Sequence, residues 1–180
     1  MLSRDARSPA HALAMTDLAM TDLAMTTTLS GRCHCGRVHV TLEITCAASN
    51  CSPRACDCSF CRKHGATWVS DPQGALRVEA RDPSDLRRYR QGSDTADMLL
   101  CAHCGVLVAV VFAHRDGFFG AINAGCLDDA ALGAAVVVSP QRLSAAEKIE
   151  RWRVLWARAE VSPPHSSLPR SSLPRSPPLE

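Results

Sequence analysis

The chain has 180 residues, of which 46% are hydrophobic and 21% charged. This balance is typical of one soluble globular domain and excludes collagen-like, coiled-coil and wholly disordered classes. Its 20 Lys and Arg residues against 18 Asp and Glu give a formal net charge of +2. Such an even balance argues against nucleic acid as a partner and against a polybasic membrane anchor.

Both ends of the chain carry short tandem repeats that lack a core-forming apolar pattern. The segment MTDLA occurs twice from residue 15, and SSLPR occurs twice from residue 166 within a Pro/Ser-rich stretch. The predicted parts are a disordered leader (residues 1–30), one folded zinc-binding domain (residues 31–160) and a disordered tail (residues 161–180). Because the repeated segment begins with Met, the predicted translation starts include, besides Met1, Met15, Met20 and Met25.

The N-terminal stretch does not have the pattern of a secretory signal. Such a signal needs an uninterrupted apolar core of about 7–15 residues, and Asp17 and Asp22 interrupt this stretch. No apolar run in the sequence reaches the length of about 18 residues that predicts a membrane-spanning helix. We therefore predict a cytoplasmic location without a membrane segment, where clustered cysteines indicate metal ligands rather than disulfides.

The folded region shows a series of short apolar patterns that predict strands. Apolar residues alternate with polar ones over residues 38–44, which is the period of two of a half-buried strand. Residues 106–112 are almost continuously apolar and predict a strand buried on both faces. Further strands are predicted at residues 67–70, 76–79, 98–100, 118–122 and 135–138. Short strands with frequent turns predict a mainly β fold built on a curled antiparallel sheet.

The C-terminal part of the folded region departs from the strand pattern. Ser144 and Glu147 have the spacing of a helix capping box. One helical face then carries the apolar residues Ile149, Trp152, Leu155, Trp156 and Ala159. This spacing predicts a C-terminal amphipathic helix that packs on the sheet.

Seven of the ten cysteines fall into three short motifs. These are a CxC pair (Cys33 and Cys35), a CxCxxC triplet (Cys56, Cys58 and Cys61) and a CxxC pair (Cys101 and Cys104). Zinc prefers tetrahedral cages of thiolates at about 2.3 Å, and one tight turn can donate two ligands. The glycines after Cys35 and Cys104 permit the left-handed backbone of such a turn. The three motifs together predict two zinc ions per chain.

The motifs divide into a group of four cysteines and a group of three. The two separated pairs can close a structural site, whereas the triplet leaves one position open for water or substrate, as catalytic zinc sites do. The predicted structural ligands are Cys33, Cys35, Cys101 and Cys104, and the predicted ligands of a second, catalytic zinc are Cys56, Cys58 and Cys61. An alternative is that Cys51 or His64 supplies the fourth ligand of the triplet and makes both sites structural.

Four segments carry a family resemblance: GRCHCGRV from residue 31, CDCSFCRKHG from residue 56, CAHCG from residue 101 and GCLDD from residue 125. In order and spacing they resemble the glutathione-dependent formaldehyde-activating enzyme family, which also includes centromere protein V. The resemblance implies a β-tent fold of antiparallel strands, a structural zinc on the CxC and CxxC cysteines, and a second zinc on the triplet. After Asp129 the sequence departs from the family pattern, and the predicted helix follows.

The resemblance also implies carbon–sulfur bond chemistry, in which glutathione adds to formaldehyde and the reverse reaction cleaves the adduct. A zinc ion with a vacant position can hold a thiol as its thiolate or polarise an aldehyde oxygen. We therefore predict a carbon–sulfur lyase that acts on a glutathione or other thiol adduct of formaldehyde or a small aldehyde. Arg62 and Lys63 are candidate glutathione contacts, and His64 is a candidate proton shuttle.

Two other functions are compatible with the residues. A non-enzymatic zinc module that recognises another macromolecule is the first, because a zinc with three thiolates is a poor activator of water and no other general base is evident. In the second, Cys126 is a redox nucleophile. Its setting without basic neighbours favours a buried, unreactive thiol instead, and the same holds for Cys46 and Cys51. His34 and His103 lie between ligands and are expected to point away from the sulfurs.

Overall fold

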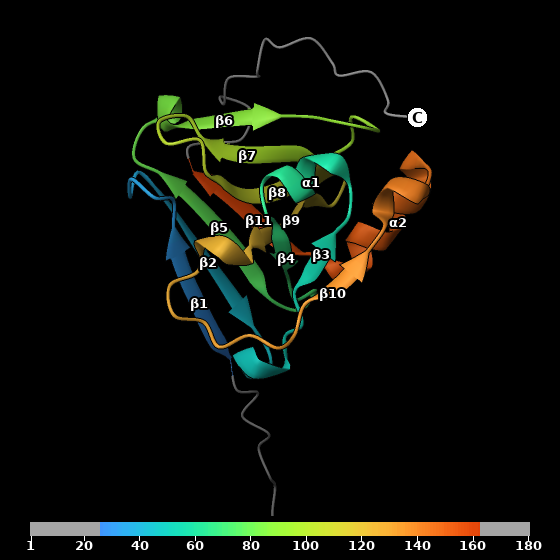
Figure 1. Ribbon diagram of the computed structural model, residues 1–180, viewed down its shortest axis with the longest axis horizontal. Coiled ribbons are helices and arrows are strands. Elements are labelled where there is room, and N and C mark those ends of the chain that lie inside the picture. The colour runs from blue at the N-terminus through green and yellow to red at the C-terminus, as the bar shows by residue number, and fades with distance from the viewer. Residues whose placement is uncertain (1–25, 163–180) are drawn as a thin grey trace, which may run out of the picture.

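The computed structural model describes residues 26–162, which form one branched sheet and two α-helices (Figure 1). The strands are β1 (Thr27–Arg32), β2 (Val38–Ile44), β3 (Arg54–Cys56), β4 (Thr67–Val69), β5 (Ala75–Ala80), β6 (Leu86–Tyr89), β7 (Asp97–Cys101), β8 (Leu107–His114), β9 (Gly117–Asn123), β10 (Val136–Val138) and β11 (Ala157–Ser162). The α-helices are α1 (Ser59–Lys63) and α2 (Ala145–Leu155). Short 3-10 helices are η1 (Ala48–Asn50), η2 (Pro83–Asp85), η3 (Ala124–Cys126) and η4 (Pro140–Arg142).

The strand β9 is the central strand of the sheet. One of its edges pairs with β8, which continues through β7 to β6. Its other edge is shared, because β11 pairs with Phe119 and Gly120 while β4 pairs with Ile122 and Asn123. From β11 the sheet continues to β5, β2 and β1, and from β4 it continues to β3 and β10. These branches spread apart and give the sheet the tent-like outline in Figure 1.

The prediction of a mainly β fold is confirmed. The strand β2 has the predicted bounds, and its residues alternate between buried and exposed or half-buried positions. In β8, the residues from Leu107 to Phe112 are all buried, as expected of a strand covered on both faces. The sheet is mixed, since β11 runs parallel to β5 and β10 runs parallel to β3. Parallel pairing needs a long connection between the strands, and in both pairs the partners lie far apart in the chain.

The start of the folded region was predicted too late. β1 begins at Thr27 and pairs with β2 as far as Arg32, so residues 27–30 of the predicted leader belong to the sheet. Leu29 is buried, and at Gly31 an added Cβ atom would clash with the Cys126 carbonyl oxygen. The segment has a single apolar side chain, so only its pairing along β2 makes it a strand. β11 likewise takes in residues 161–162 of the predicted tail, and residues 1–25 and 163–180 lie outside the described part.

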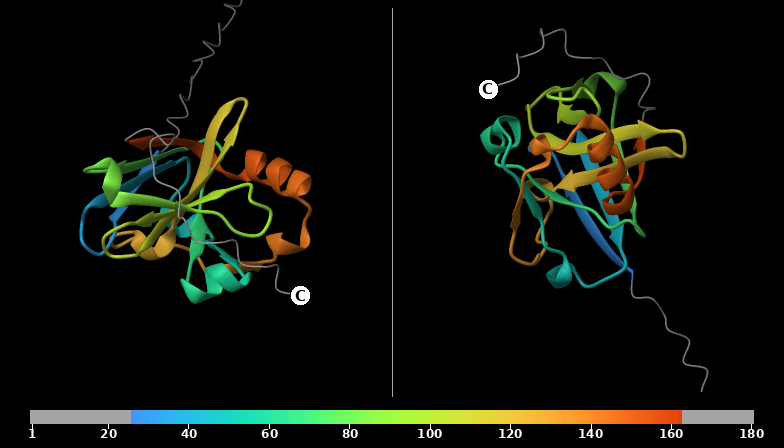
Figure 2. Two further views of the ribbon diagram at one scale, coloured as in Figure 1. Left: turned by 90° about the horizontal axis from the view of Figure 1, so that it is seen from above. Right: turned by 90° about the vertical axis from the view of Figure 1, so that its right-hand side faces the viewer.

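The C-terminal helix is confirmed, with a shorter extent than its apolar pattern predicts. The Ser144 hydroxyl accepts a hydrogen bond from the Glu147 backbone, and the Glu147 carboxylate accepts one from the Ser144 backbone. The helix ends at Leu155, because the chain continues into β11, which pairs with β5 and β9. Trp156 and Ala159 therefore leave the helix. Figure 2 shows α2 beside the hairpin of β8 and β9, where Trp152 packs against Phe112.

The interior consists of two apolar clusters. The aliphatic cluster is built mainly from β2, β5, β8 and β11, and it includes Cys33 and Cys101. The aromatic cluster contains Trp68, Phe112, Phe119 and Trp156, and it includes Cys61. Each cluster thus carries cysteines of a different motif group. Among the described residues, no helix is long and apolar enough to span a membrane.

Candidate functional site

The first group of cysteines lies where two hairpin turns meet. Cys33 and Cys35 stand in the turn between β1 and β2, whereas Cys101 ends β7 and Cys104 lies in the turn before β8. The four sulfur atoms lie within 4.8 Å of one another. The tertiary structure therefore brings together the four residues predicted to form the structural site.

The backbone of each turn explains why these cysteines point toward one another. Gly36 has a φ of +71° and Gly105 a φ of +76°, a left-handed conformation that favours glycine. The Gly36 N–H donates to the Cys33 carbonyl oxygen, and the Gly105 N–H donates to the Cys101 carbonyl oxygen. Each hydrogen bond tightens the turn, so that both of its cysteines face the same point.

The donor set of this group fits a tetrahedral metal ion. The Cys35 sulfur lies 3.5 Å from the Cys33 sulfur and 3.6 Å from the Cys101 sulfur. Four sulfurs at about 2.3 Å from one zinc ion would lie about 3.8 Å apart. The Val38 N–H also donates to the Cys33 sulfur at 3.3 Å, a contact that stabilises a thiolate. The four thiols would fill all positions of such an ion.

The triplet lies on a single short segment. Cys56 ends β3, Cys58 is the N-cap of α1, and Cys61 lies in α1. The Cys58 sulfur accepts a hydrogen bond from the Cys61 backbone N–H at 3.4 Å. The three sulfur atoms lie within 4.8 Å of one another. Local structure alone thus gathers the triplet, without a contribution from a distant turn.

Hydrogen-bond donors also surround the triplet sulfurs. The Trp68 indole N–H donates to the Cys61 sulfur at 3.4 Å, and the Gln91 side-chain amide donates to the Cys58 sulfur at 3.9 Å. Contacts from Cys56 and then Cys61 lower the pKa of Cys58 to about 2. The contact with Cys58 raises the pKa of Cys56 to about 11. Contacts with Cys56 and then Cys58 raise the pKa of Cys61. The cluster by itself therefore favours a single thiolate, at Cys58, and a bound metal ion would have to displace the protons of the other two thiols.

Neither residue considered as a fourth ligand joins the triplet in the described part of the chain. The Cys51 sulfur lies 3.2 Å from the Cys46 sulfur instead. The exposed His64 packs its ring against Phe60, with the ring centroids 4.5 Å apart. The triplet therefore offers three ligand atoms and an open side.

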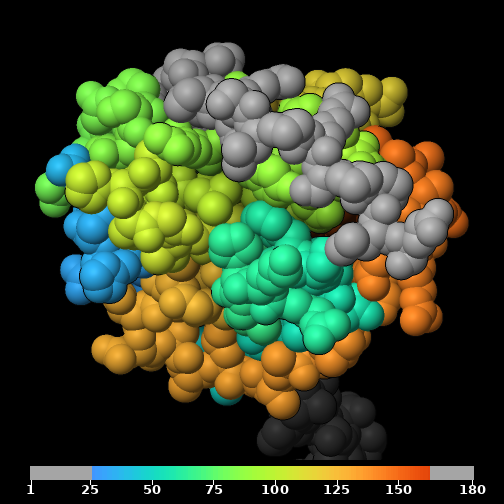
Figure 3. All heavy atoms as spheres, turned by 45° about the horizontal axis from the view of Figure 1, so that its top comes forward, coloured from blue at the N-terminus to red at the C-terminus, as the bar shows by residue number. Residues whose placement is uncertain are grey.

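A cavity of about 1150 Å³ lies on that open side, and all three triplet cysteines line it. The chain has eight aromatic residues (three Trp, one Tyr and four Phe), and five of them line the cavity, namely Phe60, Trp68, Tyr89, Trp152 and Trp156. Figure 3 shows this face, where the segment around α1 lies next to the segment that leads to α2. The few aromatic residues are thus concentrated around the candidate site.

The cavity also has a basic character that the sequence did not reveal. Its basic lining residues are Arg54, Lys63, Arg90, Lys148 and Arg151, and its acidic ones are Asp57 and Asp94. Burial, followed by the positive charge of Arg151, lowers the pKa of Arg54. Asp57 lies between two triplet cysteines, and hydrogen bonds from Ser139 and then Gln141 lower its pKa. The cavity therefore favours an anionic ligand.

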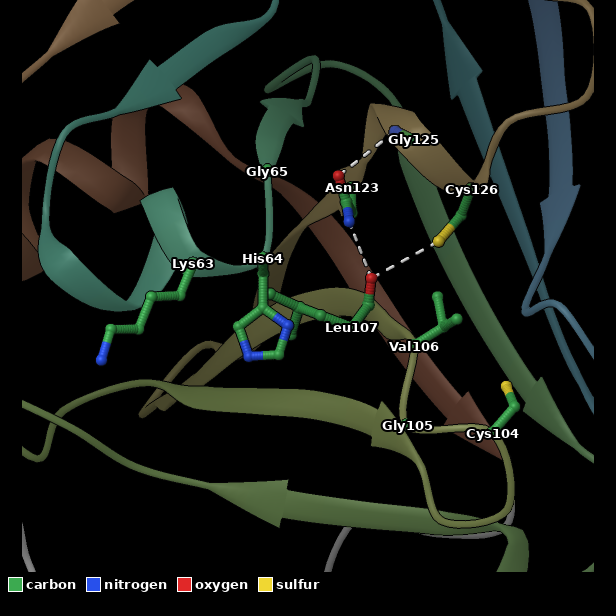
Figure 4. A pocket seen from close by; sticks show the side chains of 10 residues that line it. All are labelled: Lys63, His64, Gly65, Cys104, Gly105, Val106, Leu107, Asn123, Gly125 and Cys126. Carbon is green, nitrogen blue, oxygen red and sulfur yellow. Dashed lines mark hydrogen bonds between the residues drawn. The ribbon is translucent and has the colours of Figure 1, made fainter.

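A second, smaller cavity of about 360 Å³ lies between α1 and the four-cysteine group (Figure 4). It is lined by His64, Asn123 and Cys126 among others, and by none of the triplet cysteines. The Asn123 amide and the Cys126 thiol both donate to the Leu107 carbonyl oxygen, at 2.8 and 3.4 Å. Burial raises the pKa of Cys126 to about 11. The raised pKa supports the interpretation of Cys126 as an unreactive thiol. His64 lines this smaller cavity and not the one beside the triplet.

The remaining predicted residues occupy different positions. Lys63 lines both cavities, whereas Arg62 lines neither, and both are exposed. His34 and His103 are exposed beside the four-cysteine group. The lining residues that sequence reasoning missed include Arg54, Trp68, Gln91, Lys148 and Arg151. The only available signal was in α2, where Lys148 and Arg151 have the helical spacing that puts them on the side of Trp152.

The protein thus belongs to the class of mainly β proteins with cysteine groups that could hold metal ions. The family described as glutathione-dependent formaldehyde-activating enzyme matches residues 28–142, and the chain belongs to this family. A solved structure of a Rhodobacter sphaeroides protein is 28% identical, and the similarity covers 61% of this chain and 99% of that chain with a TM-score of 0.44. No curated protein matches the chain.

Proposed function

We propose that this chain is a zinc-dependent carbon–sulfur lyase, which joins a thiol to formaldehyde or another small aldehyde and cleaves the adduct. Glutathione is the thiol that the family description supports. The observation that carries the proposal is the cavity of about 1150 Å³ that all three triplet cysteines line. A metal site that opens on a cavity of this size has room for a substrate, whereas a closed site does not.

The two cysteine groups have separate roles in this proposal. Cys33, Cys35, Cys101 and Cys104 would hold a structural zinc, and Cys56, Cys58 and Cys61 would hold the second. When bound at the triplet, zinc supplies a Lewis acid that favours the thiolate form of a thiol. The indole of Trp68 orients the Cys61 sulfur, and the amide of Gln91 orients the Cys58 sulfur. Both contacts hold the triplet in a fixed geometry around the substrate position.

The reaction conserves atoms and electrons without a further reactant. The thiol sulfur forms a bond to the aldehyde carbon, and the π electron pair of the C=O bond moves to the oxygen. The proton lost by the thiol ends on that oxygen, and cleavage of the adduct reverses each change. Five aromatic residues line the cavity beside the triplet, and Tyr89 and Gln91 provide polar hydrogens in the lining. A reduced thiol is required, in agreement with the predicted cytoplasmic location.

Exchange spectroscopy on glutathione and formaldehyde tests this proposal. The zinc-loaded protein is expected to accelerate exchange between free and hydroxymethylated glutathione, and Cys58→Ser is expected to abolish the acceleration. Metal analysis is expected to give two zinc ions per wild-type chain and one per variant chain. Exchange that equals the uncatalysed rate at full zinc content would contradict the proposal and favour a module that recognises another macromolecule.

A further inference from the structure

Three basic residues of the large cavity have no carboxylate partner within residues 26–162. They are Arg54 on β3 and the pair Lys148 and Arg151 on α2, here called the cationic wall. All three residues are half-buried. Basic residues normally stay exposed or paired, because an unpaired charge loses hydration when it is buried. The wall therefore requires an explanation.

The helix α2 presents two different faces. Ala145, Lys148, Arg151, Trp152 and Leu155 line the cavity at the spacing of one helical face. The acidic residues of the helix bond elsewhere. Glu147 caps the helix through Ser144, and Glu150 pairs with Arg153 at 2.9 Å. Both helical members of the wall thus face the cavity without a counterion from their own helix.

Arg54 has the least satisfied side chain of the wall. Its Nη2 atom is buried and has no hydrogen-bond partner among the described residues. A buried donor without an acceptor costs free energy, and the positive charge of the neighbouring Arg151 adds repulsion. An anion placed between the two guanidinium groups would remove both costs.

The acidic residues of the cavity bond to groups outside the wall. The Asp57 carboxylate accepts hydrogen bonds from the Ser139 hydroxyl at 2.6 Å and from the Gln141 amide at 2.5 Å. The charge of Asp94 acts on Arg90, which also binds Asp97 at 2.5 Å. The wall therefore has no carboxylate partner within residues 26–162.

The cationic wall and the triplet are connected through β3 and β10. Arg54 lies two residues before Cys56 on the same strand. The Asp57 N–H donates to the Val138 carbonyl oxygen, which ties the triplet segment to β10 and so to the chain that leads into α2. A ligand in this cavity can therefore meet the triplet at one end and the wall at another.

We propose that the cationic wall binds a carboxylate of the substrate thiol and thereby selects anionic thiols over neutral ones. The inference rests on the proposed function for the sulfur end of the substrate, whereas the carboxylate end rests on the unpaired cations alone. Lys148 and Arg151 lie beyond residue 142, where the family match ends. The helical part of the wall is thus a feature of this chain outside the matched region.

Calorimetry on the zinc-loaded full chain with three ligands tests the inference. Glutathione has a thiol and two carboxylates, its diethyl ester keeps the thiol but loses both carboxylate charges, and S-methylglutathione keeps the carboxylates but loses the thiol. The variants are Lys148→Gln, Arg151→Gln and their combination. Arg153→Gln is the matched control, because Arg153 lies on the same helix, pairs with Glu150 and does not line the cavity.

The wild-type chain is expected to bind glutathione about tenfold or more tightly than the diethyl ester, a difference of about 1.4 kcal/mol. The double variant is expected to lose this preference, while its affinity for the ester stays within about twofold of wild type. Arg153→Gln is expected to match wild type with both ligands. Equal wild-type affinity for glutathione and its ester overturns the inference, as does an equal loss for both ligands in the double variant.

The third ligand separates this inference from the proposed function. Equal binding of glutathione and S-methylglutathione, both weakened by the double variant, supports the wall while the thiol-dependent function fails. A strict requirement for the free thiol, with the ester bound as well as glutathione, supports the function while the wall fails. Absence of binding by all three ligands at millimolar concentration contradicts both.

Discussion

The four-cysteine group connects parts of the chain that lie far apart, since Cys35 and Cys101 are separated by 66 positions. The triplet spans only the six residues from Cys56 to Cys61. Because loop-closure entropy grows with the logarithm of loop length, a crosslink over 66 residues constrains the unfolded chain by about 2 kcal/mol more than one over six. The same ligand chemistry is therefore expected to stabilise the fold more at the first group than at the second.

The two cysteine groups also differ in their surroundings. Cys33 and Cys101 are each 1% exposed and belong to the aliphatic cluster, whereas Cys104 is half-buried and Cys35 is exposed, so the first group lies at the edge of the core. Cys56 and Cys58 are half-buried and line the large cavity. A metal ion held by four thiolates has no open position for a substrate, whereas an ion held by three beside a large cavity has one. Four predictions test this contrast between a structural and a reactive site.

The largest effect is expected from Cys104→Ser in the four-cysteine group. A structural zinc contributes roughly 10–16 kcal/mol of apparent binding free energy, as much as or more than the about 5–15 kcal/mol that stabilises a typical domain. The variant is therefore expected to lose its cooperative thermal transition in circular dichroism. Cys46→Ser is the control, because Cys46 is half-buried but belongs to neither metal group. A wild-type melting midpoint in Cys104→Ser without its zinc would show that the group is not structural.

A second substitution, Cys58→Ser, is expected to separate activity from folding. Cys58 is the N-cap of α1, and serine is a favoured N-cap residue, so the helix keeps its cap. We expect the loss of one zinc ion and of glutathione–formaldehyde exchange, with a change of less than about 2 kcal/mol in the free energy of unfolding. Parallel metal analysis and urea denaturation measure both quantities. Complete unfolding would move the triplet into the structural class.

A smaller effect is expected from Trp68→Phe, which removes the N–H that donates to the Cys61 sulfur. Residues that hydrogen-bond to metal ligands typically change metal affinity by about 10–100-fold. We expect a loss of about tenfold in zinc affinity at the triplet and none at the four-cysteine group, measured by competition with a chromophoric chelator. Trp152→Phe is the control, because Trp152 lines the same cavity. Equal zinc affinity in the two variants contradicts a role for the indole N–H.

The smallest effect is expected at the two basic residues after the triplet. Lys63 lines the large cavity and Arg62 does not, although both are exposed. An exposed charge contact contributes about 0.2–1 kcal/mol, so Lys63→Ala is expected to weaken glutathione binding by at most about fivefold. Arg62→Ala is expected to bind glutathione as wild type does. A larger loss in Arg62→Ala than in Lys63→Ala, measured by calorimetry, would reverse this assignment.

Features determined by neighbouring residues could be predicted from the sequence. The alternation in residues 38–44 predicted β2 with its observed bounds, and the Ser144 and Glu147 pair predicted where α2 begins. The cysteine motifs predicted both groups. Cysteines on one tight turn lie close together, so the motifs can be combined into metal sites in only a few ways. Strand β1 could not be predicted, since its single apolar side chain, Leu29, is buried only once the strand pairs with β2.

The sequence by itself determined which cysteines group together and that the fold is mainly β, because spacing and periodicity express local geometry. Only the tertiary structure decided what faces the triplet. Trp68, Arg54 and Arg151 come from β4, β3 and α2, and their meeting depends on the branching of the sheet at β9 and on the return of the chain through β10. No local pattern records such a meeting, because the packing of distant elements fixes which residues share a cavity.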